Sequence, residues 1–343
     1  MRRHILIIGA GFSGISGALS AALFLKKNNC TDVSVTVLSP LPTEHGALVF
    51  DECGSRKMES LLTQLFENGR IKFVAGIANG IDAVRHRVEY TASQGIYSWI
   101  TYDRLILAAG SRVVRPHLDG VEHAFDVNPL DTTACLEKHI TALAHYPDST
   151  ARNTVVICGG GFSGLESATR IPARLHSRLG PDVKIKVIVI DGSAEMGSGP
   201  AGRLNPQLAQ SVARHDIEWH LNARVASLDT NGITLIDGRR IESKTVVWTV
   251  GHRASHLTEH ISTRCDRLGR LHVDQSLQVL GHQDIYAAGD VAALGSVDEG
   301  CYPTRSYQLA VSMGDTAGHN AAADILGAPR KTCLQREAID INA

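Results

Sequence analysis

Short runs of apolar, mostly β-branched residues recur along the chain, and many of them end at a glycine, serine or aspartate. Such uninterrupted runs are typical of strands that are buried on both faces of a parallel sheet. We expect strands at 4–8, 33–40, 71–78, 86–90, 102–108, 154–158, 183–191, 245–251, 270–274 and 284–292. Small and apolar residues at helical spacing predict a helix at 307–326. The pattern as a whole predicts an α/β protein.

Two of the expected strands are followed by almost the same sequence. The segment HILIIGAGFSGISGA opens the chain, and TVVICGGGFSGLESA begins at Thr154. Their first glycines, Gly9 and Gly159, are 150 positions apart, which is about the length of one domain. The glycine spacing also favours a strand, turn and helix at the N-terminus over a signal peptide. The repeat therefore predicts two Rossmann-like dinucleotide-binding domains.

The glycines of each copy have separate physical roles. The first allows a tight turn, the second lets the backbone approach a pyrophosphate, and the third lets the helix pack closely on the strand. The helix N-terminus then offers unpaired N–H groups and a partial positive charge to the phosphates. The cofactor-binding residues predicted from this motif are Gly9, Gly11, Phe12, Ser13, Gly14, Gly159, Gly161 and Gly164.

The residue that ends the second strand of each copy is expected to face an adenosine ribose. In the first copy this residue is Ser39, a neutral hydrogen-bonding partner, and in the second copy it is Asp191. A carboxylate accepts hydrogen bonds from both ribose hydroxyls and repels a 2′-phosphate. Asp191 therefore predicts NADH rather than NADPH.

Composition and charge exclude several classes of function. The 343 residues are 43% hydrophobic, and the mean hydropathy of −0.03 is typical of an ordinary globular protein. The net charge of −1 argues against a nucleic-acid groove or a polybasic membrane patch. No apolar stretch reaches the roughly 18 residues of a membrane span, so we expect no transmembrane helix.

The cysteines and histidines give no metal or disulfide signature. Seven cysteines, an odd number without a C-x-x-C pair, favour a reducing and therefore cytoplasmic location over a disulfide framework. His252, His256 and His260 have helical spacing and lie close to Glu259, but no general-base motif accompanies them. We expect solvated or interface histidines there and no bound metal.

Five segments together resemble the flavoproteins of the pyridine nucleotide-disulphide oxidoreductase group. They are, in chain order, GAGFSG, YDRLILAAGS, GGGFSG, TVVWTVG and IYAAGD. The resemblance implies that the first unit binds FAD non-covalently and that an inserted second unit binds NAD(P)H. It implies an FAD-binding domain at 1–112, an NAD(P)H-binding domain at 113–252 and a second segment of the FAD-binding domain at 253–343.

Within this group the chain is most similar to type II NADH dehydrogenases, through VVWTVGHRAS and DRLGRLHVDQSLQVLGHQDIYAAGD. This likeness implies that Glu166 lies near the nicotinamide, that Gln308 lies near the flavin and quinone, and that Asp290 binds the ribityl chain. The same likeness implies further cofactor contacts at Ile77, Gly110 and Gly289. Asp290 as a helix N-cap, and Glu166 and Gln308 as solvated helix residues, are the structural alternatives.

The implied activity is hydride transfer from NADH to flavin, followed by electron transfer to a small-molecule acceptor such as a quinone or a small electron carrier. The membrane-docking C-terminal module of quinone-reducing members has no counterpart after Leu326, so the acceptor, a peripheral membrane contact and a homodimer stay open. One alternative is sulfide or persulfide oxidation through Cys301, for which we find no convincing second cysteine. Another is a non-catalytic, flavin-binding redox sensor.

Overall fold

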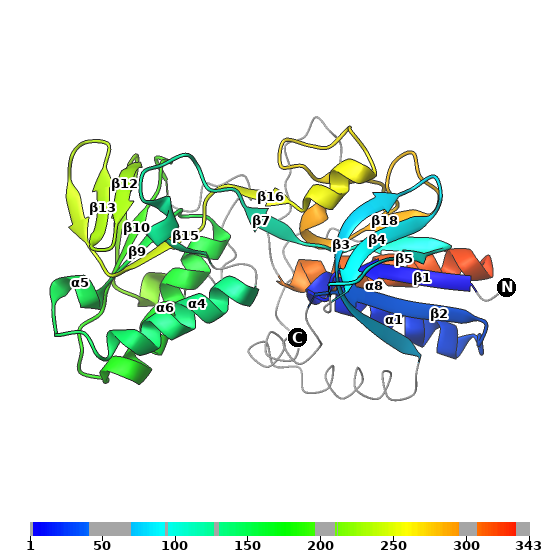
Figure 1. The fold of residues 1–343 in the computed structure, drawn as a ribbon, viewed down its shortest axis with the longest axis horizontal. Helices are drawn as coiled ribbons and strands as arrows, with labels where there is room; N and C mark the ends of the chain where they lie inside the picture. Colours follow the sequence, from blue (N-terminus) through cyan, green and yellow to red (C-terminus); the bar gives the residue numbers. More distant parts are fainter. Residues whose placement is uncertain are drawn as a thin grey trace. The chain divides into compact units, whose positions relative to one another are not determined.

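The computed structural model describes residues 3–40, 70–92, 95–126, 130–195, 210, 212–294 and 307–333. The chain forms two compact units (Figure 1). It passes from unit 1 into unit 2 between Ser111 and Arg112 and returns to unit 1 between His252 and Arg253. Two short strands at these crossings, β7 (Ser111–Val113) and β16 (His252–Ala254), pair with each other. Unit 1 is therefore built from segments on both sides of unit 2 in the sequence.

Unit 1 contains a seven-stranded sheet. Its strands are β1 (Arg3–Ile8), β2 (Val33–Ser39), β3 (Ile71–Asp82), β4 (Arg87–Ala92), β5 (Tyr97–Thr101), β6 (Arg104–Leu107) and β18 (Ile285–Ala287). The order is β18-β6-β1-β2-β3-β4-β5. The pairs from β18 to β3 are parallel, and the pairs β3-β4 and β4-β5 are antiparallel. The buried strands β1 and β6 are the apolar runs that the sequence places at the centre of a parallel sheet.

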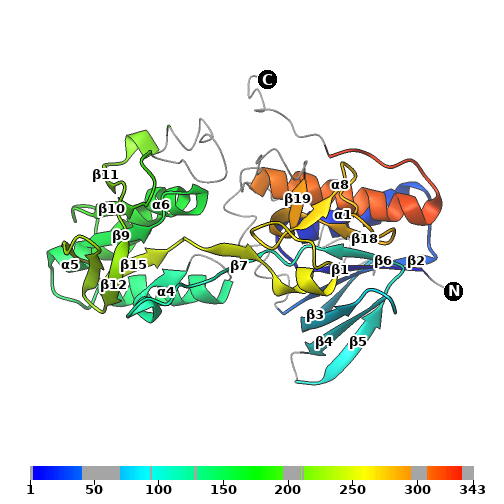
Figure 2. The same ribbon diagram turned by 90° about the horizontal axis from the view of Figure 1, so that it is seen from above.

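Two helices pack together on one face of this sheet, α1 (Phe12–Lys27) and α8 (Tyr307–Leu326) (Figure 2). Small residues let their backbones approach closely, because a Cβ atom on Gly318 would overlap the carbonyl oxygen of Gly17. Two serines of α1 add hydrogen bonds across the contact: Ser16 donates to the Val311 carbonyl and Ser20 to the Asp315 carbonyl, both at 2.8 Å. The remaining elements of unit 1 are η2 (His256–His260), β17 (Leu271–Val273), η3 (Gly289–Val291) and β19 (Ala292–Leu294).

Unit 2 is built on a five-stranded parallel sheet. Its strands are β8 (Phe125–Asp126), β9 (Thr154–Cys158), β10 (Lys186–Ile190), β11 (Ile217–His220) and β15 (Thr245–Trp248), in the order β11-β10-β9-β15-β8. Two helices, α4 (Leu130–Leu143) and α6 (Phe162–Leu179), lie beside it. A three-stranded antiparallel sheet is formed by β12 (Val225–Asp229), β13 (Gly232–Leu235) and β14 (Arg240–Glu242). Two short elements complete unit 2, η1 (Val121–His123) and α5 (Thr150–Asn153).

The side chains of β9 alternate between two apolar cores. Val155 and Ile157 pack with Ile140 of α4 and Leu175 of α6. Val156 and Cys158 face the opposite way and pack with β12 and β13 residues such as Ile233. This alternation follows from the period of two residues in a strand. It explains why every residue of β9 is buried.

The α/β class is confirmed, with Rossmann-like parallel strands in both units and an antiparallel extension, β4 and β5, in unit 1. The helix expected at 307–326 is α8 over the same residues. The strand expected to end at residue 78 continues to Asp82, because β4 pairs with it antiparallel as far as Arg87. The sheet β12-β13-β14 and strand β5 were not predicted.

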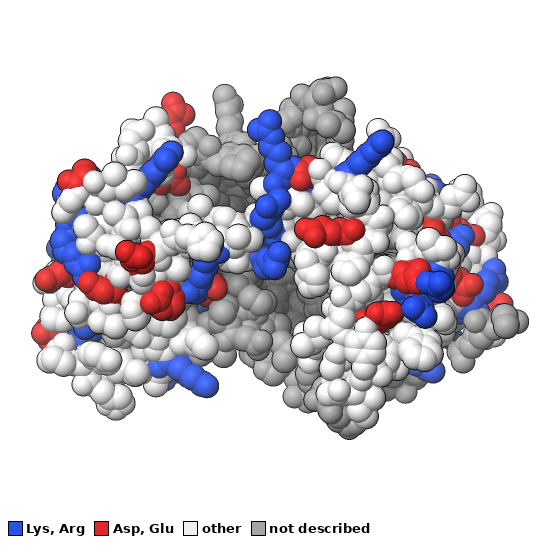
Figure 3. Space-filling model, turned by 45° about the horizontal axis from the view of Figure 1, so that its top comes forward, with Lys and Arg blue, Asp and Glu red and all other residues white. Residues whose placement is uncertain are grey.

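Positive and negative side chains are interspersed on the face that Figure 3 shows. Among the described residues, no helix is long and apolar enough to span a bilayer.

Candidate functional site

The predicted FAD-binding residues of unit 1 meet at one edge of its sheet. Because β1, β2, β6 and β18 are parallel, their carboxyl ends point the same way. Backbone hydrogen bonds tie these ends together: Gly9 donates to the Leu38 carbonyl at 2.9 Å, and Ala288 donates to the Leu107 carbonyl at 3.0 Å. Strand β1 has two neighbours in the sheet: β2, to which the chain continues after the first helix, and β6, which lies on the opposite side of β1. Ligands of open α/β sheets bind at such a switch point.

Packing accounts for two of the three glycines in the first turn. Gly9 has φ = +106°, and a Cβ atom there would overlap the carbonyl oxygen of Ala108. A Cβ atom on Gly14 would overlap the carbonyl oxygen of Gly9, so helix α1 could not pack against the turn. Both residues must therefore be glycine for the fold alone.

The middle glycine of this turn has no such structural reason. Gly11 is the N-cap of α1 with φ = −75°, which any residue can adopt, and a Cβ atom there would meet no atom of the described residues within 4 Å. Within the described part of the chain, no side chain caps the helix at this end. The described residues thus leave space over the N-terminus of α1, and the helix dipole favours an anion there.

Asp290 lies beside this turn and is oriented by a neighbour that the sequence analysis did not single out. Its Oδ2 accepts a hydrogen bond of 2.6 Å from the Ser111 hydroxyl. Gly289 has φ = +74°, and a Cβ atom there would lie 2.6 Å from the hydroxyl of the buried Ser13. The Gly110 carbonyl accepts a bond of 3.0 Å from the Ser255 N–H. The signal for Ser111 was its place directly after the Ala-Ala-Gly that follows β6.

The other predicted residues of unit 1 lie at neighbouring positions. Ser39 is the last residue of β2, is buried, and pairs in register with Ala75 of β3. Ile77 follows two residues later, and 57% of it is exposed. Phe12 is the first residue of α1 and packs partly against the core. Gln308 is the second residue of α8, and its side chain lies outside the described part of the chain.

The second glycine-rich turn repeats the geometry in unit 2. Gly159 has φ = +116°, and a Cβ atom there would lie 2.6 Å from Thr249 Oγ1. A Cβ atom on Gly164 would overlap the Gly159 carbonyl oxygen. One on Gly161, the N-cap of α6, would meet none of the described residues within 4 Å, and no described side chain caps this helix end. The hydroxyl of Thr249 donates to the carbonyls of Cys158 at 2.9 Å and Gly159 at 3.2 Å, which fixes the turn. The open position is again the middle glycine.

Asp191 follows β10 directly and is bound to the second turn. Its Oδ2 accepts a hydrogen bond from the Gly160 N–H, and its Oδ1 accepts one of 2.7 Å from the Ser193 N–H. The carboxylate is therefore held beside the turn by two backbone donors. A carboxylate in this place can accept bonds from ribose hydroxyls.

The two residues expected to be catalytic belong to different units. Glu166 is on α6 of unit 2, and its Oε1 lies 3.1 Å from Arg170 Nη1 in a half-exposed i,i+4 pair. Gln308 is on α8 of unit 1. Their roles stay predictions.

Burial makes three of the described cysteines poor nucleophiles. Burial raises the pKa of the Cys158 thiol to about 12 and also raises the pKa of Cys265 and Cys333. All described cysteines are free thiols. Cys301, the residue of the sulfide-oxidation hypothesis, lies outside the described residues.

The three spaced histidines do not share a helix face. His252 is in strand β16, while His256 and His260 are at the two ends of η2 with ring centroids 6.2 Å apart. The described ranges contain no group of three histidine, cysteine or acidic side chains that could hold a metal ion.

Comparisons with known proteins identify the family of the chain. Residues 3–317 match the family model described as pyridine nucleotide-disulphide oxidoreductase. The chain is 36% identical over 338 residues to the NADH dehydrogenase-like protein Rv1812c of Mycobacterium tuberculosis. This match covers 95% of the present chain and 82% of the mycobacterial protein. It is 26% identical over 339 residues to a type II NADH:quinone oxidoreductase of Staphylococcus epidermidis, with 93% and 82% covered.

Among solved structures, the fold is similar to a NAD-dependent persulfide reductase from A. fulgidus. The TM-score is 0.70 at 19% sequence identity, and the match covers 96% of this chain. This chain spans only 60% of that structure's chain.

Proposed function

Because this chain belongs to the pyridine nucleotide-disulphide oxidoreductase family and is an oxidoreductase, we propose that it takes a hydride from NADH onto FAD and passes the electrons to a small-molecule acceptor. Its family uses FAD and NADH. The observation that carries the proposal is the pair of glycine-rich turns, each with an open middle glycine at an uncapped helix N-terminus. Packing does not require glycine at Gly11 or Gly161, whereas a bound pyrophosphate does.

The residues of unit 1 fit FAD. Gly11 leaves room for the pyrophosphate, Ser39 can bond a ribose hydroxyl, and Asp290 can accept a bond from the ribityl chain while Ser111 orients it. Ile77, Gly110 and Gly289 complete the proposed lining. FAD, when bound, supplies the two-electron redox chemistry, and the protein aligns and tunes it.

The residues of unit 2 fit NADH. Gly161 leaves room for the pyrophosphate at the N-terminus of α6, and Asp191 is held where an adenosine ribose would bind. Glu166 is proposed to face the nicotinamide. Its pairing with Arg170 is worth only about 0.3–0.5 kcal/mol at an exposed site, so the carboxylate can change partners at small cost.

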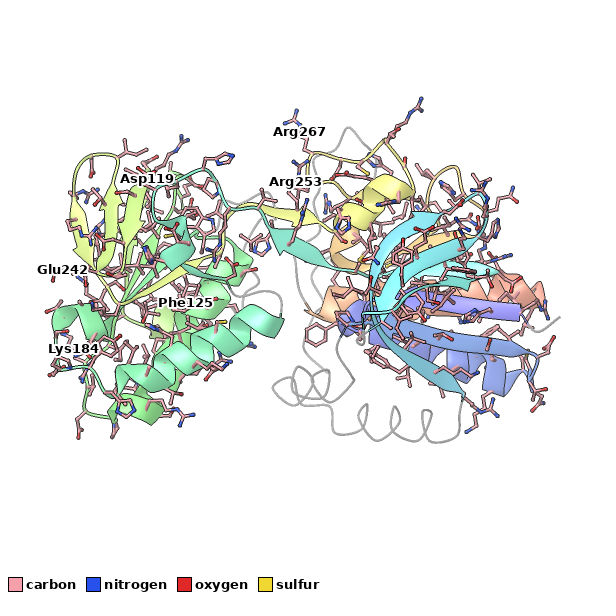
Figure 4. All side chains as sticks on the ribbon, viewed as in Figure 1. Asp119, Phe125, Lys184, Glu242, Arg253 and Arg267 are labelled. Carbon is pink, nitrogen blue, oxygen red and sulfur yellow. The ribbon has the colours of Figure 1, made fainter. Side chains whose placement is uncertain are left out.

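The proposed acceptor is a quinone or a small electron carrier, with Gln308 on the acceptor side. A carrier with negative charge is compatible with exposed arginines of unit 1. Arg253 donates to the Arg267 carbonyl at 3.4 Å, and both project from the same part of that unit (Figure 4).

The described thiols are all free, which supports a cytoplasmic location.

An absorbance spectrum of the purified protein followed by anaerobic mixing with NADH tests the proposal. We expect a yellow protein whose flavin is bleached rapidly and is reoxidised by one member of a panel of quinones and electron carriers. A flavoprotein that NADH does not bleach would instead support the redox sensor. Bleaching by sulfide that is lost in Cys301→Ser would support sulfide oxidation. Light scattering on the same sample measures whether a homodimer forms.

The Ser111→Ala variant is expected to bind FAD about tenfold more weakly. The Asp290 carboxylate loses its donor, and a hydrogen bond to a charged group contributes about 1.5 kcal/mol or more. Titration of the deflavinated protein with FAD, followed by fluorescence, measures the change. Ser177→Ala, an exposed serine on α6, is the matched control. Equal affinity in Ser111→Ala and wild type would remove Ser111 from the site.

The Asp191→Asn variant is expected to raise the KM for NADH about tenfold without changing the flavin content. Asparagine keeps one acceptor oxygen but loses the charge that strengthens bonds to the ribose hydroxyls. Steady-state kinetics with excess acceptor measures the KM. Loss of flavin from this variant would contradict the assignment of Asp191 to the nicotinamide nucleotide.

A further inference from the structure

Two backbone segments of unit 2 are paired beside the carboxylate of Asp191. The Ala223 N–H donates to the Asp191 carbonyl at 2.9 Å, and the Asn222 N–H donates to the Ser193 carbonyl at 2.9 Å. These two bonds fix the segment between β11 and β12 against the residues that follow β10. Arg224, the next residue along, is therefore held close to Gly192.

The side chain of Arg224 lies in the space above Gly192. A Cβ atom on Gly192 would be 3.6 Å from Arg224 Nε and 3.9 Å from its Cγ. Arg224 thus occupies the place of the side chain that Gly192 lacks. Arg224 is exposed, and among the described residues no hydrogen bond or ion pair engages its guanidinium.

The adenosine end of the proposed nucleotide site therefore carries two opposite charges. Asp191 is fixed by the N–H groups of Gly160 and Ser193, and the Arg224 cation covers the adjacent position. A carboxylate alone repels a 2′-phosphate, but a neighbouring arginine accommodates it. A guanidinium binds phosphate oxygens in a bidentate manner.

We propose that Arg224 binds the 2′-phosphate of NADPH, so that this chain accepts NADPH as well as NADH. The inference rests on the proposed function, since it uses the same adenosine site. It extends the prediction from Asp191 alone, because the Arg224 charge offsets the repulsion between Asp191 and the phosphate.

Calorimetric titration of the full-length protein with 5′-AMP and with adenosine 2′,5′-bisphosphate tests this without turnover. We expect the wild type to bind both compounds with affinities within about tenfold of each other. Arg224→Ala should weaken binding of the bisphosphate at least tenfold more than binding of 5′-AMP, and Arg224→Lys should restore part of the loss because it keeps the charge. Arg178→Ala removes an exposed arginine from the far end of α6 and serves as the matched control.

Three other outcomes would each overturn the inference. Equal weakening of both compounds in Arg224→Ala would assign the side chain to the adenine or to the local structure. Wild-type binding of 5′-AMP with bisphosphate binding more than a hundredfold weaker would mean that the site rejects the phosphate. If the wild type bound neither compound, unit 2 would have no adenosine site, and its proposed function in binding NADH would be wrong as well.

Discussion

A folded protein that purifies without flavin is the expected result of replacing Gly11 by valine. The backbone of Gly11 has φ = −75°, and a Cβ atom there meets no atom of the described residues within 4 Å. The backbone and the Cβ atom of valine are therefore compatible with the described packing of unit 1. Its methyl groups instead occupy the space over the N-terminus of α1, where the pyrophosphate would approach the backbone. We expect the affinity for FAD to fall more than about a hundredfold, which corresponds to roughly 3 kcal/mol.

The matched substitution in unit 2 separates the two nucleotide sites. Gly161 has the same place in its turn and the same open surroundings. Gly161→Val is expected to keep its flavin but to lose bleaching by NADH. The ratio of flavin to protein absorbance, anaerobic mixing with NADH, and the melting temperature of each flavin-free protein measure the three effects.

Three results with these two variants would contradict the assignment of FAD to unit 1 and NADH to unit 2, or the open space on which it rests. If Gly11→Val retained its flavin while Gly161→Val lost it, FAD would bind to unit 2 and NADH to unit 1, which is the reverse of the proposed assignment. If both variants were yellow and reducible, neither open glycine would face a phosphate. A large drop in the melting temperature of either variant would mean that the open space is filled in solution by the protein itself.

The sequence indicates the candidate residues that a local pattern marks. Gly9 and Gly159 are predicted from the spacing of the glycine-rich motif, and the structure gives both a positive φ and a close approach to the residues after a neighbouring strand. Asp191 is predicted because a carboxylate stands out at the end of an apolar run, and its role stays a prediction. The buried central strands were found for the same reason, since both of their faces are apolar.

The elements and contacts that the sequence did not indicate depend on residues or segments that no local pattern marks. Strand β5 alternates between exposed and half-buried residues, so it has no continuous apolar run. Ser111 reaches Asp290 across 179 positions of sequence. Arg224 is placed by hydrogen bonds between the segments that follow β10 and β11, and nothing in its neighbours along the chain marks it. Glu166 and Gln308 were assigned through family likeness alone.

Substitution of Gly318 by alanine is expected to destabilise the protein, although helix propensity predicts the opposite. Alanine in place of glycine inside a helix normally stabilises by about 1 kcal/mol. Here the added methyl would overlap the carbonyl oxygen of Gly17, and backbone atoms cannot turn aside as a side chain can. Overpacking of this kind costs about 3 kcal/mol, so we expect a net loss of about 2 kcal/mol in the free energy of unfolding.

The functional consequence follows from the position of α1. Its N-terminus holds the first glycine-rich turn, and a Cβ atom on Gly314 of α8 would overlap the Ser13 carbonyl of that turn. If α8 moves away to admit the methyl of Gly318→Ala, the support behind the turn is lost, and FAD affinity should fall together with stability. Chemical denaturation of the flavin-free protein and an FAD titration measure the two losses. Ser177→Ala, at an exposed position of α6, gains helix propensity and should be as stable as the wild type or slightly more so. Equal stability of Gly318→Ala and Ser177→Ala would mean that α1 and α8 do not pack this closely in solution.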